Sequence, residues 1–90
     1  MYIITNRHHT VLYTGVSSRL EKRLWEHQNK ISPESFSSKY RCTKLVYYLW
    51  FDSIVDAIAE EKRIKGGNRA QKIALVSAMN PTWSDLGLLL

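Results

Sequence analysis

A chain of 90 residues and 10.5 kDa has room for one domain with one hydrophobic core, which we place at residues 1–90. Its composition, 44% hydrophobic and 23% charged, excludes wholesale disorder. The single cysteine excludes an internal disulfide and a cysteine-rich zinc site. No apolar run is long enough to cross a bilayer, and the N-terminus has no signal-peptide pattern. We therefore expect a cytosolic protein, by default a monomer, with no membrane partner.

The net charge of +5 is unevenly distributed along the chain. Residues 1–44 carry eight lysines and arginines against three acids, whereas residues 45–90 carry five of each. In that second half, the five basic residues lie together between Lys62 and Lys72. Basic clusters suit a polyanion, and nucleic acid is the commonest one. Charge alone does not separate this interpretation from an ordinary solvated basic surface.

In chain order, the first predicted element is a β-hairpin. Runs of β-branched and aromatic residues predict strands over Tyr2–Thr5 and Thr10–Thr14, joined by a polar segment. Gly15 ends the second strand. A serine at position 17 or 18 can then cap a helix that runs to about Lys30.

The rest of the chain predicts a loop, a strand and two helices. The loop covers residues 31–41, and its length of about ten residues suggests a functional role. The run Thr43–Phe51 is apolar on both faces, which predicts a central strand. A helix follows over about 53–65, stops at Gly66-Gly67, and is succeeded by another over about 68–79. The order ββαβαα implies an α/β protein of the α+β type, with a small, mostly antiparallel sheet flanked by helices.

Charged residues occupy positions in two predicted helices where the pattern favours apolar ones. In the first helix, Arg23 and His27 complete the stripe of Leu20 and Leu24, and in the second, Glu61 interrupts an apolar stripe. Inward-facing charges are costly unless they are paired or bind something. The alternatives are a buried Arg23–Glu61 salt bridge, long side chains that reach water, or a functional site. The interrupted stripe consists of Ile54, Ala57, Ile58 and Ile64.

Two tyrosines of the predicted hairpin are further candidates. Tyr2 and Tyr13 lie eleven positions apart, near the outer ends of two paired strands, so they can lie close in space. Tyrosines in strands commonly pack or stack. A tyrosine beside an arginine and a metal ion could instead act as a general base.

These positions belong to a longer series of motifs. Met1-Tyr2-Ile3 is followed by Tyr13-Thr14-Gly15, then by Arg23 and His27 on one predicted helix and Glu61 on a later one. This ordered set resembles the GIY-YIG nuclease domain, and the surrounding segments resemble the small stand-alone bacterial branch of that family. The similarity covers nearly the whole chain. Those segments are Leu12–Val16, Leu20–His27, Cys42–Tyr48, Ala57–Lys62 and Asn80-Pro81.

Several positions depart from the family pattern, among them Thr14, where an aliphatic residue is usual, and Glu60, at a place that is often basic. The chain begins at Met1, where the first motif has its glycine, and Gly66-Gly67 replaces a basic and aromatic pair. No asparagine falls at the position of the family's last motif, for which Asn68 and Asn80 are the nearest candidates.

The resemblance implies a three-stranded antiparallel sheet flanked by helices, and metal-dependent hydrolysis of DNA phosphodiester bonds. By position, Tyr2 and Tyr13 match the two motif tyrosines. Arg23 and His27 match the arginine and histidine of the helix, and Glu61 matches the metal-binding glutamate. One divalent ion, Mg²⁺ or Mn²⁺, would be held by Glu61 together with waters and phosphate. Arg23 would donate hydrogen bonds to the phosphate, and one of the tyrosines would deprotonate the attacking water.

DNA is the expected partner, and RNA stays open because phosphate contacts do not identify the sugar. The tryptophans at positions 25, 50 and 83 could stack on bases, but no basic residues are interleaved around Trp50, so packing is the favoured assignment for all three. The competing interpretation is a nucleic-acid-binding module that has the same fold but cleaves poorly or not at all. The expected nucleic-acid contacts are five basic residues: Lys22, Lys62, Lys65, Arg69 and Lys72.

Overall fold

The computed structural model describes residues 1–29 and 41–89, apart from the side chains of His27 and Leu89. The elements follow in the order ββαβαα with a short 3-10 helix at the end, which confirms the predicted α+β class. The predicted loop over 31–41 lies outside the described residues, except for Arg41. The strands are β1 (Tyr2–Thr5), β2 (Leu12–Gly15) and β3 (Lys44–Tyr48). The helices are α1 (Leu20–Gln28), α3 (Ile54–Lys65), α4 (Arg69–Met79) and η1 (Leu86–Leu89).

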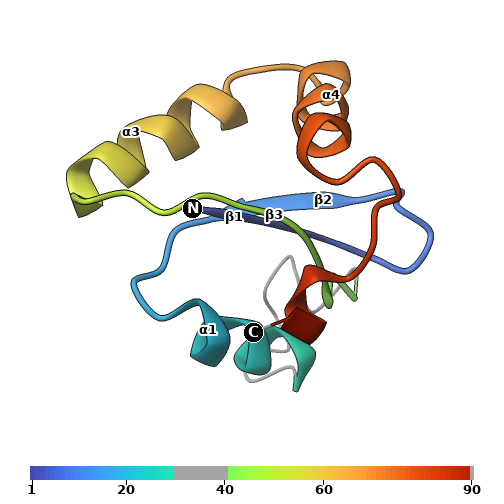
Figure 1. The fold of residues 1–90 in the computed structure, drawn as a ribbon. Helices are drawn as coiled ribbons and strands as arrows, with labels where there is room; N and C mark the ends of the chain where they lie inside the picture. Colours follow the sequence, from blue (N-terminus) through green and yellow to red (C-terminus); the bar gives the residue numbers. More distant parts are fainter. Residues whose placement is uncertain (30–40, 90) are drawn as a thin grey trace.

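The three strands form one antiparallel sheet in the order β2-β1-β3 (Figure 1). The prediction that the Thr43–Phe51 strand is central is wrong, because β1 is the middle strand and β3 pairs with β1 at the edge. Helices α1 and η1 lie on one face of the sheet, and α3 and α4 lie on the other (Figure 1). The apolar pattern of β3 therefore reflects cover on both faces and not a central position.

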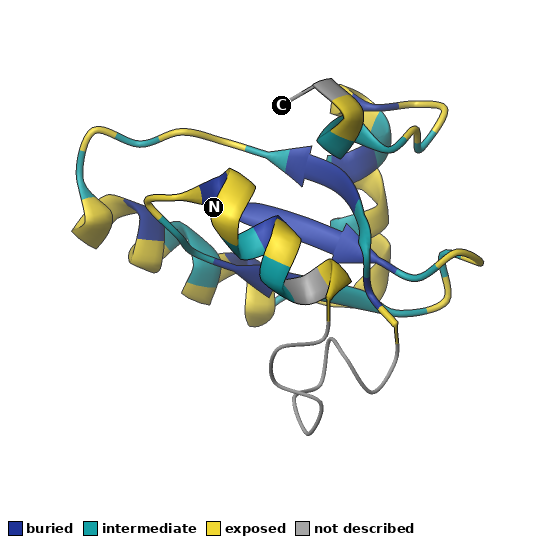
Figure 2. Cartoon of the chain, turned by 90° about the horizontal axis from the view of Figure 1, so that it is seen from below, coloured by how far each residue is buried: buried dark blue, intermediate teal, exposed yellow. Residues whose placement is uncertain are grey.

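The alternating side chains of β1 contribute to an apolar cluster on each face of the sheet. Ile3 packs with Ile64 and Val76 beneath α3 and α4. Tyr2 and Ile4 point the other way, into the cluster covered by α1. Figure 2 shows the outcome, with buried strands between helices whose outer sides are exposed.

Helix α3 presents a narrower apolar face than its sequence predicts. Ala57 and Ile64 are buried against the sheet, but Ile54 and Ile58 are exposed. Glu61 is four residues after Ala57 and three before Ile64, so it shares their side of the helix. A carboxylate is thus presented towards the sheet between two buried apolar contacts.

The two asparagines near the family's last motif position both bind the backbone. The register between β1 and β3 slips by one residue at Val46, which forms a bulge. The buried side chain of Asn80 donates to the carbonyl of Val46 at 3.2 Å and to that of Ser84 at 2.8 Å. Asn68 caps α4, because its side chain accepts a hydrogen bond from the backbone N–H of Gln71 at 2.8 Å. Both side chains therefore have structural roles.

The tryptophans divide between packing and exposure. Trp83 packs as predicted, with its indole N–H donating to the Ser77 hydroxyl at 3.1 Å and its ring 5.0 Å from that of His9. The packing prediction is wrong for Trp25 and Trp50, which are 56% and 60% exposed. Trp25 lies on the outer side of α1, and Trp50 follows the end of β3, where the chain has left the sheet.

Candidate active site

The hairpin places the two motif tyrosines on one face of the sheet. In the register of β1 and β2, Tyr2 pairs with Gly15 and Ile4 pairs with Tyr13. The tyrosines are therefore diagonal neighbours, within reach of each other's side chains. Tyr2 is only 2% exposed, whereas Tyr13 is partly buried at the border of the same cluster.

Gly15 allows the Tyr2 ring to lie directly against the backbone of β2. A Cβ atom at position 15 would come within 2.5 Å of both the Cζ and the hydroxyl oxygen of Tyr2. No side chain can occupy that space while the ring stays in place. Gly15 thus has a steric role in the motif, because it leaves room for the ring of Tyr2 on the neighbouring strand.

We expect Gly15→Ala to lower the free energy of unfolding by about 1–3 kcal/mol, because a buried ring has to shift to admit the methyl group. Equilibrium urea unfolding measures this change. Gly66→Ala is the matched control, since a Cβ there meets nothing closer than 3.4 Å and the residue has a helical φ of −73°. Equal stability of the two variants would show that the Tyr2 ring is not held against position 15.

Arg23 extends from α1 to the hydroxyl of Tyr2. Its guanidinium donates a hydrogen bond to that hydroxyl and also lies 3.7 Å from the carboxylate of Glu26. The Arg23 side chain is still 42% exposed. Burial raises the pKa of the Tyr2 hydroxyl above its ordinary value of 10.0, and the hydrogen bond from Arg23 only partly offsets this effect. Tyr2 is therefore protonated at neutral pH in this arrangement.

Glu61 approaches the same region from α3. Its side chain is 19% exposed, and the amine of Lys65 lies 3.7 Å away. Burial is the main cause of the raised pKa of Tyr2, and the negative charge of Glu61 raises it further. Burial also lowers the pKa of the Met1 amine, and Glu61 opposes that change. Both effects place the Glu61 carboxylate near the start of β1.

The buried Arg23–Glu61 salt bridge that the sequence allows is not formed between these two described residues. Each charge has a partner on its own helix, Glu26 for Arg23 and Lys65 for Glu61. Both pairs are partly exposed, so each contributes little to stability. Neither charge is fully buried, since the Arg23 side chain is 42% exposed and that of Glu61 is 19% exposed.

The structure brings together four of the five predicted catalytic residues: Tyr2, Tyr13, Arg23 and Glu61. The fifth, His27, follows Arg23 by one turn of α1, but its side chain lies outside the described part of the structure. Across residues 1–29 and 41–89, no three His, Cys, Asp or Glu side chains lie together in a way that could hold a metal ion.

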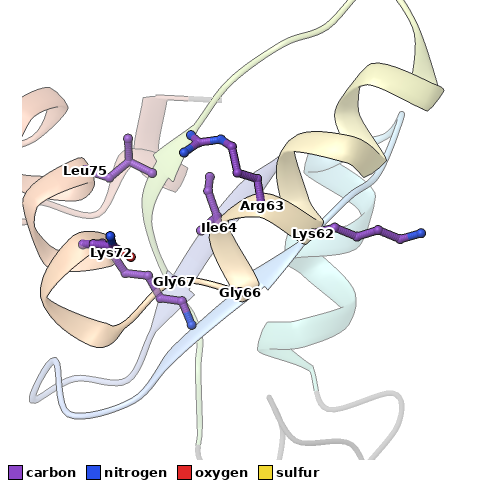
Figure 3. Close-up of a pocket in the computed structure, with 8 residues that line it drawn as sticks. Lys62, Arg63, Ile64, Gly66, Gly67, Lys72 and Leu75 are labelled. Atoms are coloured by element: carbon purple, nitrogen blue, oxygen red, sulfur yellow. The ribbon is translucent and has the colours of Figure 1, made fainter.

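Two of the predicted basic contacts line a pocket of about 520 Å³ where the end of α3 meets the start of α4 (Figure 3). Lys62 and Arg63 come from α3 and Lys72 comes from α4, and Lys62 points away from α4 (Figure 3). Arg63 forms an ion pair with Glu60 on its own helix. The basic block between positions 62 and 72 is therefore a surface shared by two helices.

The other three predicted contacts have different surroundings. Lys22 lies on α1, across the sheet from α3 and α4 (Figure 1). Lys65 pairs with Glu61 at 3.7 Å, and Arg69 donates to the backbone carbonyl of His9 at 2.9 Å. The five predicted contacts thus do not form one continuous patch.

The sequence did not predict two features of this region. The Tyr2–Arg23 hydrogen bond depends on how α1 is seated on the sheet, which no local pattern reports. Trp50 and the start of α1 line a common pocket, although they are distant in the chain. The only available signal was Trp50 itself, a large aromatic residue beyond the last paired residue of its strand.

The chain is similar to known proteins over most of its length. The family model of the GIY-YIG catalytic domain matches residues 1–74, so the chain belongs to the GIY-YIG family, a family of nucleases. Its similar relatives include the small stand-alone UPF0213 protein of Syntrophus aciditrophicus, which is 36% identical over 70 residues. That match covers 78% of this chain and 79% of the relative.

Two further UPF0213 proteins are similar to the chain. The one from Staphylococcus saprophyticus is 35% identical over 66 residues, which cover 73% of this chain and 79% of the relative. The one from Clostridium perfringens is 36% identical over 67 residues, which cover 74% and 71% respectively. No solved structure matches the chain significantly. Within the described ranges, no helix has the length and apolar character needed to cross a membrane.

Proposed function

We propose that this protein is a metal-dependent endonuclease that hydrolyses DNA phosphodiester bonds. The observation that carries the proposal is the convergence of Tyr2, Tyr13, Arg23 and Glu61 from four different elements, with the Arg23–Tyr2 hydrogen bond between them. Membership of a nuclease family supports a nucleic acid substrate. The choice of DNA over RNA belongs to the proposal.

GIY-YIG nucleases generally depend on a divalent metal, and the chemistry around Glu61 fits such an ion. The carboxylate is a hard oxygen ligand, and the Lys65 amine at 3.7 Å is too distant for a strong hydrogen bond. Mg²⁺ binds proteins through one or two carboxylates and keeps waters and phosphate oxygens as its other ligands. We assign one Mg²⁺ or Mn²⁺ ion to Glu61. When bound, it would offset the negative charge of the reacting phosphate and of the leaving oxygen.

Arg23 would hold the phosphate. A guanidinium carries five N–H donors in a planar fork that matches phosphate oxygens. The hydrogen bond to Tyr2 orients this fork, and the exposed part of the side chain leaves room for the substrate. Tyr13 would deprotonate the attacking water, and the protonated Tyr2 hydroxyl would position that water and Arg23.

Arg23→Ala is expected to lower the rate of single-turnover cleavage by about 100-fold or more, with a much smaller loss of DNA affinity. The reason is that a donor to the developing charge acts mainly in the transition state. Rates are measured with Mg²⁺ at saturating protein, and affinity is measured by fluorescence anisotropy in EDTA.

Glu26→Gln is the matched control, because it removes the other partner of Arg23 and leaves the guanidinium in place. It should retain the wild-type rate. If Arg23→Ala alters only affinity, and the wild-type protein binds DNA without metal-dependent cleavage, the nucleic-acid-binding module becomes the correct assignment.

A further inference from the structure

Trp50 is exposed in a pocket that none of the proposed catalytic residues lines. The pocket has a volume of about 390 Å³ and lies between Trp50 and the start of α1. The indole is 60% exposed, although its ring centroid is 5.9 Å from that of Tyr48. The other residues lining the pocket are Ser18, Arg19, Leu20, Glu21 and Lys22.

The lining of this pocket suits a nucleotide. The indole offers a flat apolar face, and every base has a π-face that can stack on it. Arg19 and Lys22 supply two positive charges and Glu21 supplies one negative charge, so the pocket is positive on balance. An aromatic platform beside cations is the usual arrangement in proteins that bind single-stranded nucleic acid. Charge complementarity therefore favours a base with its phosphate over an apolar partner.

The pocket borders the proposed catalytic groups. Arg19 precedes Arg23 by one helical turn, and the backbone N–H of Arg23 donates to the carbonyl of Arg19 at 3.0 Å. An adjoining pocket of about 250 Å³ shares Trp50 and extends to Met1 and Ala57. Met1 directly precedes Tyr2, and Ala57 lies one turn before Glu61 on α3. Trp50 thus lines two adjoining pockets, and the residues of their linings neighbour the proposed catalytic residues in the chain.

We infer that Trp50 stacks on an unpaired base of the substrate, while Arg19 and Lys22 contact the adjoining phosphate. This inference rests on the proposed function and deepens it, because it names an unpaired base beside the cleaved bond as the feature that is recognised. A paired base is stacked inside its helix and does not offer its face to a side chain, so a continuous duplex would not use the pocket.

The test compares Trp50→Ala with Trp25→Ala, since Trp25 is the second exposed tryptophan and does not line this pocket. Affinities are measured in EDTA, by fluorescence anisotropy, for a labelled mixed-sequence single-stranded DNA oligonucleotide and for its duplex. We expect Trp50→Ala to weaken single-strand binding by about 10-fold and to leave duplex binding unchanged. Trp50→Phe should retain most of the affinity, and Trp25→Ala should match the wild-type protein.

Arg19→Gln supplies an independent measurement. It should reduce the dependence of log Kd on log salt concentration by about 0.7 for a single strand, which corresponds to one lost phosphate contact. The inference is overturned if Trp50→Ala binds the single strand as well as the wild-type protein, or loses equal affinity for single strand and duplex.

Failure of the proposed nuclease function would be distinguishable from failure of the base-stacking inference. A wild-type protein that does not cleave DNA with Mg²⁺, but loses single-strand affinity only on Trp50→Ala, would overturn the nuclease assignment and retain the base-stacking pocket. If the wild-type protein cleaves DNA but Trp50→Ala and Trp25→Ala bind single-stranded DNA equally well, the base-stacking inference is overturned and the nuclease assignment is retained. The base-stacking inference is also overturned if the wild-type protein binds neither the single strand nor the duplex.

Discussion

Replacing Glu61 with glutamine is expected to reduce metal-dependent cleavage by about 1000-fold or more, because the metal's contribution of several kcal/mol to the transition state is lost. Glutamine keeps the shape and the hydrogen-bonding capacity of the side chain but lacks the negative charge that a divalent cation requires. The measurement is single-turnover cleavage of a plasmid or labelled oligonucleotide over a range of Mg²⁺ and Mn²⁺ concentrations.

The loss should not come from unfolding. Among the described residues, Glu61 is paired only with Lys65, at 3.7 Å and on a partly exposed helix surface, so the change in unfolding free energy should stay within about 0.5 kcal/mol. Removal of a charge that faces the sheet could even stabilise the protein. Urea unfolding of the variant checks this point.

Glu60→Gln is the matched control for Glu61→Gln. Glu60 is the adjacent residue of α3, but its carboxylate forms an ion pair with Arg63 and is turned by about 100° around the helix. The hydrogen bond from Arg63 is the main cause of the lowered pKa of Glu60, so this carboxylate is ionised at neutral pH and yet committed to its own partner. Cleavage by Glu60→Gln should equal that of the wild-type protein. Unchanged Mg²⁺-dependent cleavage by Glu61→Gln would remove the metal-binding role of Glu61.

Local sequence signals were sufficient to predict the elements and their order. Strand composition identified β1 and β2, and the Gly66-Gly67 pair separated α3 from α4, as the structure confirms. The position of β3 in the sheet could not be obtained in this way. A strand that is apolar on both faces can lie in the middle or at a covered edge, and only the pairing with β1 decides between these.

The candidate site shows the same division between local and long-range information. The helical periodicity singled out Arg23 and Glu61 because each is charged on the side of its helix that faces the sheet. Periodicity cannot report what such a residue meets. The partner of Arg23 is Tyr2, and this contact depends on the β1–β2 register and on the room that Gly15 leaves for the ring. Tyr2 and Gly15 were visible in the sequence as parts of two motifs, but their contact arises only in the folded sheet.

The two tyrosines can be assigned separate roles through the pH dependence of cleavage. A general base has to be deprotonated, so the rate rises with pH until its pKa is passed. Burial raises the pKa of Tyr2 above 10.0, and its hydroxyl already accepts a hydrogen bond from Arg23. Tyr13 is less buried and stands two residues before Gly15 at the end of β2, beside the chain that leads to α1. These surroundings favour Tyr13 as the base.

Tyr13→Phe is therefore expected to lower turnover by about 100-fold or more and to remove the rising limb of the pH–rate profile. The phenyl ring retains the apolar contacts of Tyr13, so stability should change little. Tyr2→Phe is the matched control: it should slow cleavage through the lost contact with Arg23 but keep the rising limb. Profiles of single-turnover rate between pH 6 and pH 10 measure both variants. If only Tyr2→Phe loses the rising limb of the profile, the roles of the two tyrosines are exchanged. If both variants keep the rising limb, neither tyrosine is the base and His27 is the next candidate.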